Sequence, residues 1–307
     1  MARPLKHPLR QIAIATNAQS EDAVSVALEG VTGITPGIHT DVQTGAVTVS
    51  AFLELADARM PEIRRAIRSA MDGLVEYGID PAPAKLSIRK VPARDWAESW
   101  KRHFKPVSIG RKLLVKPTWN RKKPAPGQAL VLLDPGLSFG TGQHATTRFC
   151  LQELVDVRDG NRPQSLLDAG MGSGILALAG VALGFAPVEG FDFDPDCVRT
   201  AGENAALNGM TNQVVFEQAD VTRLPKRPKK KFDVVCANLM ADLLIAEAPR
   251  LVTRVASGGR LILAGILTTQ FPAVEEAFSK LGWTRLHDCV EREWKSGSFV
   301  RAEEAAT

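Results

Sequence analysis

The second half of the chain repeats one pattern, in which a short apolar run is followed by a stretch of helical periodicity. The apolar runs have the length of buried strands. They lie at residues 165–169, 188–193, 214–217, 234–237 and 260–264. Strands that alternate with helices in this way form a parallel, doubly wound sheet, because each helix carries the chain back to the start of the next strand. From residue 129 onward the sequence therefore predicts an α/β domain.

The first 91 residues predict a smaller domain of another kind. Strand-like runs lie at 11–16, 46–55 and 85–91, helical runs lie at 21–30 and 61–77, and a weak strand is expected between 34 and 42. The order strand, helix, strand, strand, helix, strand is that of a ferredoxin-like α+β module. Residues 92–128, which contain tryptophans among many charges and then a Pro- and Lys-rich stretch, are interpreted as a connector.

The composition of the 307 residues is that of a globular protein, since 45% are hydrophobic and 23% are charged, which excludes a wholly disordered chain. A net charge of +4 permits a nucleic-acid partner without requiring one. The four cysteines form no CxxC pair and so predict neither a zinc knuckle nor a disulfide framework. No apolar run reaches the roughly 20 residues that span a bilayer. We therefore expect a cytoplasmic protein without a membrane partner.

A glycine-rich turn follows the first strand of the α/β domain, in the sequence Leu166-Leu-Asp-Ala-Gly-Met-Gly-Ser-Gly174. Glycines let the backbone approach a ligand closely, and the helix that follows presents unsatisfied amides. Gly170, Gly172 and Gly174 have the spacing Gly-x-Gly-x-Gly, whereas dinucleotide-binding turns have Gly-x-Gly-x-x-Gly. This spacing favours S-adenosylmethionine over NAD as the cofactor. The alternative is a tight strand-to-helix connection without a ligand.

Acidic residues follow the next two strands. Asp192 comes 22 residues after Gly170, at a strand end where a carboxylate can accept hydrogen bonds from both hydroxyls of a ribose. Asp194 competes for this role, and we favour Asp192. Asp220 follows the third strand and could accept a hydrogen bond from an adenine amino group, although a solvated loop aspartate explains it equally well.

An asparagine ends the fourth strand. The side-chain amide of Asn238 is expected at the crevice where open α/β sheets bind their ligands, and this makes it the candidate for aligning a substrate. The competing interpretation is a cap for a helix that begins near Met240. Upstream, residues 133–147 combine three glycines with hydroxyl groups and His144, and they predict a loop or lid over the glycine turn. We expect a structural role for His144.

Together these motifs resemble the PrmA family, the S-adenosylmethionine-dependent methyltransferases of large-subunit ribosomal protein eleven. The resemblance rests on residues 134–147, the glycine turn, Gly190-Phe-Asp-Phe-Asp-Pro195 and Ala237-Asn-Leu239. Further matches are Glu203, Asn204, Asn208, Gly209 and residues 265–267, together with Asp95, Trp96, Trp100, Lys101 and residues 104–106 of the connector.

The resemblance implies a seven-stranded, Rossmann-like class I methyltransferase domain at 129–307 and a substrate-recognition domain at 1–91. It also implies cofactor contacts at Thr147, Gly170, Asp192 and Asn238. We extend the predicted S-adenosylmethionine site by Phe139, Gly172, Gly174 and Asp220, and we predict no metal.

The predicted function is a protein N-methyltransferase that acts on lysine side chains or N-terminal α-amino groups of a large-subunit ribosomal protein, without nucleic acid. Asn238 is the predicted catalytic residue, with His144 and Asp242 as candidates if a general base is required. One alternative is a methyltransferase of another protein or of a small amine. Another is an RNA-binding module, but such modules stack bases on aromatic residues and the strand at 46–55 offers only Phe52. The oligomeric state stays open.

Overall fold

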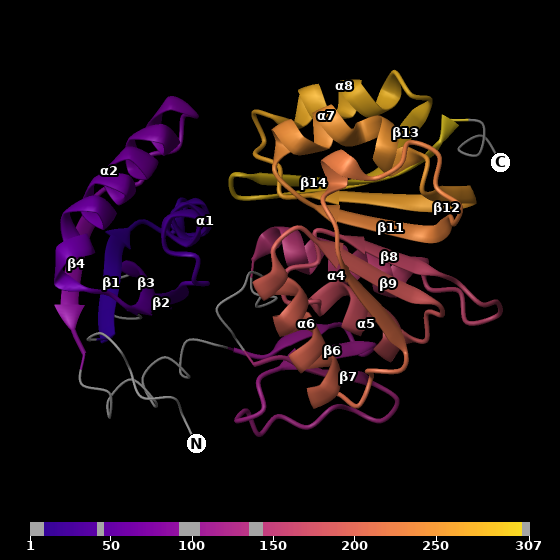
Figure 1. The fold of residues 1–307 in the computed structure, drawn as a ribbon, viewed down its shortest axis with the longest axis horizontal. Coiled ribbons are helices and arrows are strands. Elements are labelled where there is room, and N and C mark those ends of the chain that lie inside the picture. The colour runs from indigo at the N-terminus through magenta and orange to yellow at the C-terminus, as the bar shows by residue number, and fades with distance from the viewer. Residues whose placement is uncertain (1–8, 42–45, 92–104, 135–143, 303–307) are drawn as a thin grey trace. The chain divides into compact units, whose positions relative to one another are not determined.

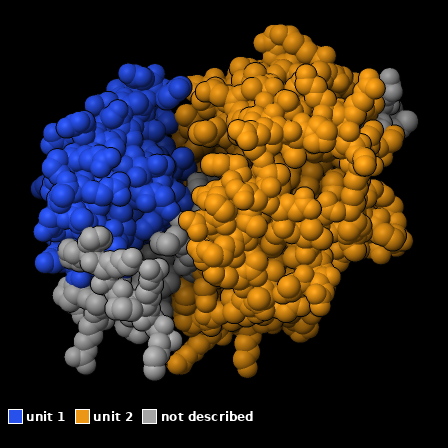
Figure 2. All heavy atoms as spheres, in the orientation of Figure 1, with its two compact units in different colours: residues 1–105, 135–139 blue, residues 106–134, 140–307 orange. Residues whose placement is uncertain are grey.

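The computed structural model describes residues 9–41, 46–91, 105–134 and 144–302. These residues form two compact units, which Figure 2 colours separately. Unit 1 contains residues 9–41 and 46–91 with Lys105, and unit 2 contains residues 106–134 and 144–302.

Unit 1 has the predicted ferredoxin-like topology. Its elements are β1 (Leu9–Thr16), α1 (Glu21–Thr32), β2 (Gly37–Thr40), β3 (Val47–Glu54), the 3-10 turn η1 (Asp57–Arg59), α2 (Met60–Glu76) and β4 (Lys85–Lys90). The sheet has the order β2-β3-β1-β4, and all of its strand pairs are antiparallel. The weak strand expected between 34 and 42 is confirmed as β2.

One face of this sheet carries the core of unit 1, because side chains alternate between the two faces along a strand. Ile12 and Ile14 of β1 are completely buried in the cluster that α1 and α2 cover. The apolar stripe of α2 lies on the same cluster, where Ile63, Ile67 and Met71 are its buried residues. Burial of this stripe explains why the amphipathic pattern of α2 could be detected from sequence.

Unit 2 is built around a seven-stranded sheet of the order β10-β9-β8-β11-β12-β14-β13. The strands are β8 (Leu166–Ala169), β9 (Val188–Asp192), β10 (Val214–Gln218), β11 (Phe232–Asn238), β12 (Val255–Ala264), β13 (Trp283–Glu291) and β14 (Trp294–Arg301). The five predicted strands are β8 to β12, which pair in parallel, whereas β14 runs antiparallel to both β12 and β13. The predicted fold class is confirmed.

Helices cover both faces of this sheet (Figure 1). They are α4 (Ala145–Val157), α5 (Ile175–Leu183), α6 (Pro195–Leu207), α7 (Ala241–Val252) and α8 (Phe271–Ser279), with the 3-10 turn η3 at Val221–Arg223. Along β8, Leu166 packs into the cluster with α4 and α5, while its neighbour Leu167 packs into the cluster with α7 and α8. Strands covered on both faces read as continuous apolar runs, which is the pattern seen in the sequence.

The beginning of unit 2 differs from the predicted connector. Residues 106–128, which we assigned to the connector 92–128, include β5 (Val107–Ile109) and β6 (Leu113–Lys116), and these pair with β7 (Ala129–Leu132) in a three-stranded sheet. Ile109 and Leu113 are buried in the same cluster as α4 and α5, so this segment belongs to the core of unit 2. The first half of the connector, 92–104, lies outside the described residues.

Candidate cofactor and substrate site

The predicted glycine turn joins β8 to α5 at the carboxyl edge of the large sheet. Gly170, Gly172 and Gly174 have φ angles of 76°, 52° and 76°, in the left-handed region that residues with a Cβ avoid. The amides of Gly170 and Met171 donate to the carbonyl of Phe191 in β9, over 2.9 and 3.0 Å. A Cβ on Gly170 would lie 2.3 Å from Leu239 Cδ2, so the turn also packs closely against the residue that follows Asn238.

Two residues without a predicted role hold this turn in place. Asp168 is buried, and its Oδ2 accepts a hydrogen bond of 3.1 Å from the amide of Ala177 in the first turn of α5. Asn204 of α6 donates from Nδ2 to the carbonyl of Ser173 over 2.9 Å. Asp168 lies in the glycine-turn sequence and Asn204 is one of the family matches, but their contacts can be seen only in the folded chain.

Burial also makes Asp168 an unusual acid. The pKa of its carboxyl is raised to about 7, mainly because burial desolvates the charged form; the hydrogen bond from Ala177 opposes this shift and the nearby Asp192 adds to it. The site therefore contains one carboxyl group whose charge changes near neutral pH.

Asp192 lies beside the glycine turn, as predicted. It is the last residue of β9 and is 7% exposed. Its Oδ2 accepts a hydrogen bond of 2.9 Å from the Gly172 amide, and its Oδ1 accepts one of 3.1 Å from the Asp194 amide. Each carboxylate oxygen can accept a second hydrogen bond, so the carboxylate retains the capacity to bind two hydroxyl groups.

Asp194 has a different task. It is the N-cap of α6, and its side chain accepts a hydrogen bond of 2.8 Å from the amide of Asp196. A side chain that caps a helix is held toward that helix, so this contact favours Asp192 over Asp194 as the ribose acceptor. Phe193, between them, is 73% exposed and offers an apolar surface at the same edge. Sequence reasoning missed Phe193, because a strand residue of this type is normally buried.

Asp220 follows β10 and caps η3. Its Oδ1 accepts hydrogen bonds from the amide and the hydroxyl of Thr222, over 2.9 and 2.8 Å. The hydrogen bond from the Thr222 amide is the largest cause that lowers the pKa of this carboxyl. The neighbouring amide of Ala219 donates to the Asp192 carbonyl over 2.9 Å, which keeps Asp220 at the cofactor edge. A contact to adenine therefore stays a prediction, beside a local capping role that the structure shows.

Asn238 is the last residue of β11 and does not cap the next helix. The N-cap of α7 is Met240, and that cap has no side-chain hydrogen bond. The Asn238 amide instead donates from Nδ2 to Thr147 Oγ1, over 3.5 Å. Thr147 is buried in the first turn of α4, so two residues predicted as cofactor contacts are brought together. This contact orients the amide with its nitrogen toward α4.

Two oxygen atoms converge next to Asn238. An ideal Cβ placed on Gly265 would lie 3.0 Å from Asn238 Oδ1 and 2.6 Å from the Leu239 carbonyl oxygen. Both hydrogen-bond acceptors therefore face the same small space above Gly265, whose φ angle of 83° also favours glycine. The sequence showed Gly265 only as a family match, because its role depends on a contact with the end of the preceding strand.

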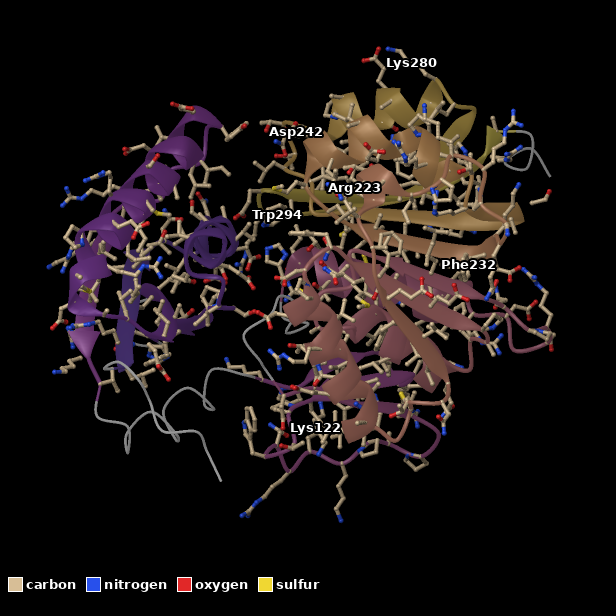
Figure 3. The ribbon with its side chains drawn as sticks, in the orientation of Figure 1. Lys122, Arg223, Phe232, Asp242, Lys280 and Trp294 are labelled. Atoms are coloured by element: carbon tan, nitrogen blue, oxygen red, sulfur yellow. The ribbon has the colours of Figure 1, made fainter. Side chains whose placement is uncertain are left out.

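Among the described residues, no contact directs either candidate base, His144 or Asp242, toward this space. His144 precedes α4, its Nδ1 lies 2.7 Å from Thr146 Oγ1, and its ring packs edge-on against Trp294 with centroids 4.8 Å apart. Asp242 is exposed in the first turn of α7, where a negative charge favours the helix. Figure 3 labels Asp242 and Trp294. Phe139, a predicted cofactor contact, lies outside the described residues.

The strand order and the residues at this edge define a class I methyltransferase architecture: a parallel sheet with one antiparallel strand, a glycine turn after β8, an acid at the end of β9 and an amide at the end of β11. The sequence profile of the family described as Ribosomal protein L11 methyltransferase (PrmA) matches residues 9–302. The chain belongs to this family, which confirms the predicted resemblance and makes the protein a methyltransferase.

Individual relatives agree with this assignment. A protein of Geobacter sulfurreducens named Ribosomal protein L11 methyltransferase is 42% identical over 247 residues, which cover 80% of this chain and 79% of that protein. A protein of the same name from Geobacter sp. (strain M21) is 37% identical over 305 residues, covering 94% and 97%. The crystal structure of a ribosomal protein L11 methylase from Lactobacillus delbrueckii subsp. bulgaricus superimposes with a TM-score of 0.57 at 29% identity, covering 64% of this chain and 98% of that one.

The pKa of Asp168 leads to a prediction about stability. An unfolded aspartate has a pKa of about 3.9, so the folded protein retains this proton up to about pH 7. The protonated form of Asp168 thus contributes stability that is complete below about pH 4 and is lost as the pH rises through about 7. Asp168→Asn keeps the shape and removes this titration. In chemical denaturation between pH 5 and 8, the free energy of unfolding of the wild type should fall relative to that of the variant. Parallel curves would contradict the shifted pKa.

Proposed function

We propose that this enzyme transfers methyl groups from S-adenosylmethionine to lysine or N-terminal α-amino nitrogens of ribosomal protein L11, in the cytoplasm. The observation that carries the proposal is the pair of acceptor oxygens, Asn238 Oδ1 and the Leu239 carbonyl, which face one space directly beside the glycine turn. The names of the relatives support the same protein substrate.

The residues at the edge fit S-adenosylmethionine. Asp192 would accept hydrogen bonds from the two ribose hydroxyls, and the exposed ring of Phe193 would cover a face of the adenine. The buried carboxylate of Asp192 favours a positively charged ligand at this point. The bound cofactor supplies a methyl group on a sulfonium sulfur, which leaves as a neutral thioether. The rest of the chemistry falls to residues of this chain.

The two acceptor oxygens suit an amine nucleophile. A neutral amine carries N–H bonds and one lone pair, and hydrogen bonds from two N–H groups to Asn238 and Leu239 would fix the direction of the lone pair. In-line displacement depends on such alignment, because a correctly held nucleophile avoids the entropy cost of orientation during the reaction. The hydrogen bond from Asn238 to Thr147 keeps the oxygen of the amide directed toward the amine.

We infer that the amine enters the site in its neutral form. Water then takes up the proton that the nitrogen loses after it has accepted the methyl group. His144 is held by Thr146 and Trp294, and Asp242 is exposed to solvent. A free lysine, with a pKa of about 10.4, is neutral in roughly one molecule per thousand near pH 7.4, whereas an α-amino group with a pKa of about 7.7–8.0 is neutral in roughly a quarter of the molecules. Lysine sites should therefore depend more steeply on pH than a chain N-terminus.

The domain roles form part of the proposal. Unit 1 would recognise the protein substrate, while unit 2 binds the cofactor and the acceptor amine. An RNA-binding role for unit 1 has little support, because Phe52 is the only Phe, Tyr or Trp on its strands β1, β2, β3 and β4. Of the helices in the described part of the chain, none combines the length and hydrophobicity needed to cross a membrane.

The direct test incubates the purified protein with S-adenosylmethionine, labelled in its methyl group, and purified ribosomal protein L11. Peptide mass spectrometry should place the label on lysine or N-terminal nitrogens of that substrate. Label on other proteins or on small amines alone would support the alternative, a methyltransferase of another protein or of a small amine. Label on carboxyl or hydroxyl oxygens would contradict an N-methyltransferase.

One prediction concerns the binding of the cofactor. Asp192→Ala should weaken binding of S-adenosylmethionine by on the order of 1–3 kcal/mol, because buried hydroxyl groups would lose their acceptor. Isothermal titration calorimetry measures the affinity. Asp194→Ala is the matched control, since it removes the cap of α6 and should lower the thermal stability while the affinity stays close to that of the wild type. The opposite ranking of the two variants would move the ribose contact to Asp194.

Another prediction concerns the two acceptor oxygens, Asn238 Oδ1 and the Leu239 carbonyl oxygen. Asn238→Ala should lower kcat by roughly ten- to a hundredfold, with a much smaller loss of cofactor affinity, since alignment matters most in the transition state. Gly265→Ala should lower kcat as well, because its Cβ would intrude between both oxygens.

Gly209→Ala controls for backbone strain in this test. Its φ angle of 67° is also left-handed, but nothing lies within 4 Å of its added Cβ. This variant should lose stability and keep its kcat. A parallel fall of kcat and cofactor affinity in Asn238→Ala would assign Asn238 to cofactor binding alone.

A further inference from the structure

Unit 2 contains a pocket of roughly 370 Å³ between α4, β5 and the hairpin of β13 and β14. Its lining residues include none of the glycine turn, Asp192 or Asn238. One end nevertheless reaches the same edge of the sheet, because Trp294 starts β14 and bridges to Leu267, just beyond the end of β12. Figure 3 labels Trp294 at this position.

A nearly buried carboxylate lines this pocket. The side chain of Glu153, in the middle of α4, is 8% exposed. The closest basic atom is Nδ1 of His287, at 3.6 Å from Glu153 Oε1, and histidine is charged only when protonated. Arg260 of β12 acts on Glu153 at longer range. Within the described ranges no group donates a hydrogen bond to this carboxylate, and a buried charge of this kind calls for a partner.

The other charged side chains of the pocket already have partners. Arg148 forms an ion pair with Glu291. Asp288 is paired with Arg285 and with Lys295, whose Nζ lies 2.8 Å from Asp288 Oδ2. Three of the four charged side chains that line the pocket are acidic, and Glu153 is the acid that lacks contact with a lysine or arginine. The pocket therefore attracts a positive charge at Glu153.

The remaining wall is apolar and aromatic. Phe149 and Trp294 line the pocket, and Trp294 is 6% exposed. Aromatic rings also favour cations at short range. An apolar stem with a positively charged head matches both the aromatic wall and the carboxylate of Glu153.

We propose that this pocket binds a lysine side chain of the protein substrate that is not the methyl acceptor. The ammonium group would pair with Glu153, and the methylene stem would pack on Phe149 and Trp294. A metal ion is a poor alternative occupant, because the described residues include no group of three or more His, Cys, Asp or Glu arranged to hold one. This proposal rests on the proposed function in one respect only, namely that the bound lysine belongs to the protein that the enzyme methylates.

The test observes tryptophan indole N–H signals by NMR in the full chain, which has five tryptophans. Trp294→Phe assigns the signal of Trp294. The probe is Nα-acetyl-lysine methylamide, and the matched ligand control is Nα-acetyl-norleucine methylamide, which lacks the ammonium group. The lysine probe should shift the Trp294 signal to saturation, whereas the norleucine probe should bind at least tenfold more weakly. Equal binding of both probes, or no saturable shift, would overturn the proposal.

Variants on α4 locate the binding. Glu153→Gln should weaken the lysine probe at least tenfold, while Asp156→Asn, which removes an exposed carboxylate from the same helix, should bind it like the wild type. If Glu153→Gln fails to fold, Cys289→Phe replaces it, because the exposed Cys289 lines the pocket and a ring there would fill the space with Glu153 intact. Wild-type binding by the folded Glu153→Gln variant, or by Cys289→Phe, would overturn the assignment.

These titrations need neither cofactor nor methyl transfer, so their outcome is independent of the proposed function. Where methylation of ribosomal protein L11 is observed, Glu153→Gln should raise KM for that substrate severalfold and leave kcat unchanged, because the pocket anchors the substrate away from the reacting atoms. A fall in kcat with unchanged KM would assign Glu153 to the chemistry and contradict an anchoring pocket. Absence of methylation in the wild type would count against the proposed function alone.

Discussion

The reversal of strand order at β8 is the constraint on which the site depends. β8 is the first strand of the large sheet along the chain and yet lies inside it, with β9 and β10 on one side and β11 and β12 on the other. The connections after β8 and β11 therefore leave the sheet in opposite directions and open a crevice at the carboxyl ends of the strands. The glycine turn, Asp192 and Asn238 all border this crevice, although 68 residues separate the first glycine from the asparagine.

Hydrogen bonds between neighbouring segments hold the edge of the sheet around the glycine turn. Asp168 caps the start of α5, Asn204 holds the carbonyl of Ser173, and Asp192 ties the turn to β9. The Asn238 amide is held by Thr147, and the amide of Leu239 donates to the carbonyl of Ala264 over 3.1 Å. Acceptors that are already in position need not reorganise during the reaction, which is the main way such a site can accelerate a displacement.

The sequence predicted the features that depend on neighbouring residues. The five parallel strands, the glycine turn, the acid after β9 and the amide after β11 are local patterns, as is the order of elements in unit 1. Contacts between distant segments could not be predicted in this way. They favour Asp192 over Asp194, exclude Asn238 as a helix cap, show the close approach of Gly265 to Asn238 and Leu239, and place residues 106–128 in the core of unit 2. The pocket at Glu153 likewise joins α4 to a hairpin more than 120 residues away along the chain.

Backbone hydrogen exchange with and without S-adenosylmethionine shows whether the carboxyl edge of β8, β9 and β11 holds the cofactor. Ligand contact slows exchange at amides that it buries or orders. We expect new protection at residues 170–174, 191–194 and 238–240, with little change at β13 and in unit 1. Protection confined to unit 1 or to the pocket of α4 and β13, in a protein that still binds the cofactor, would contradict it.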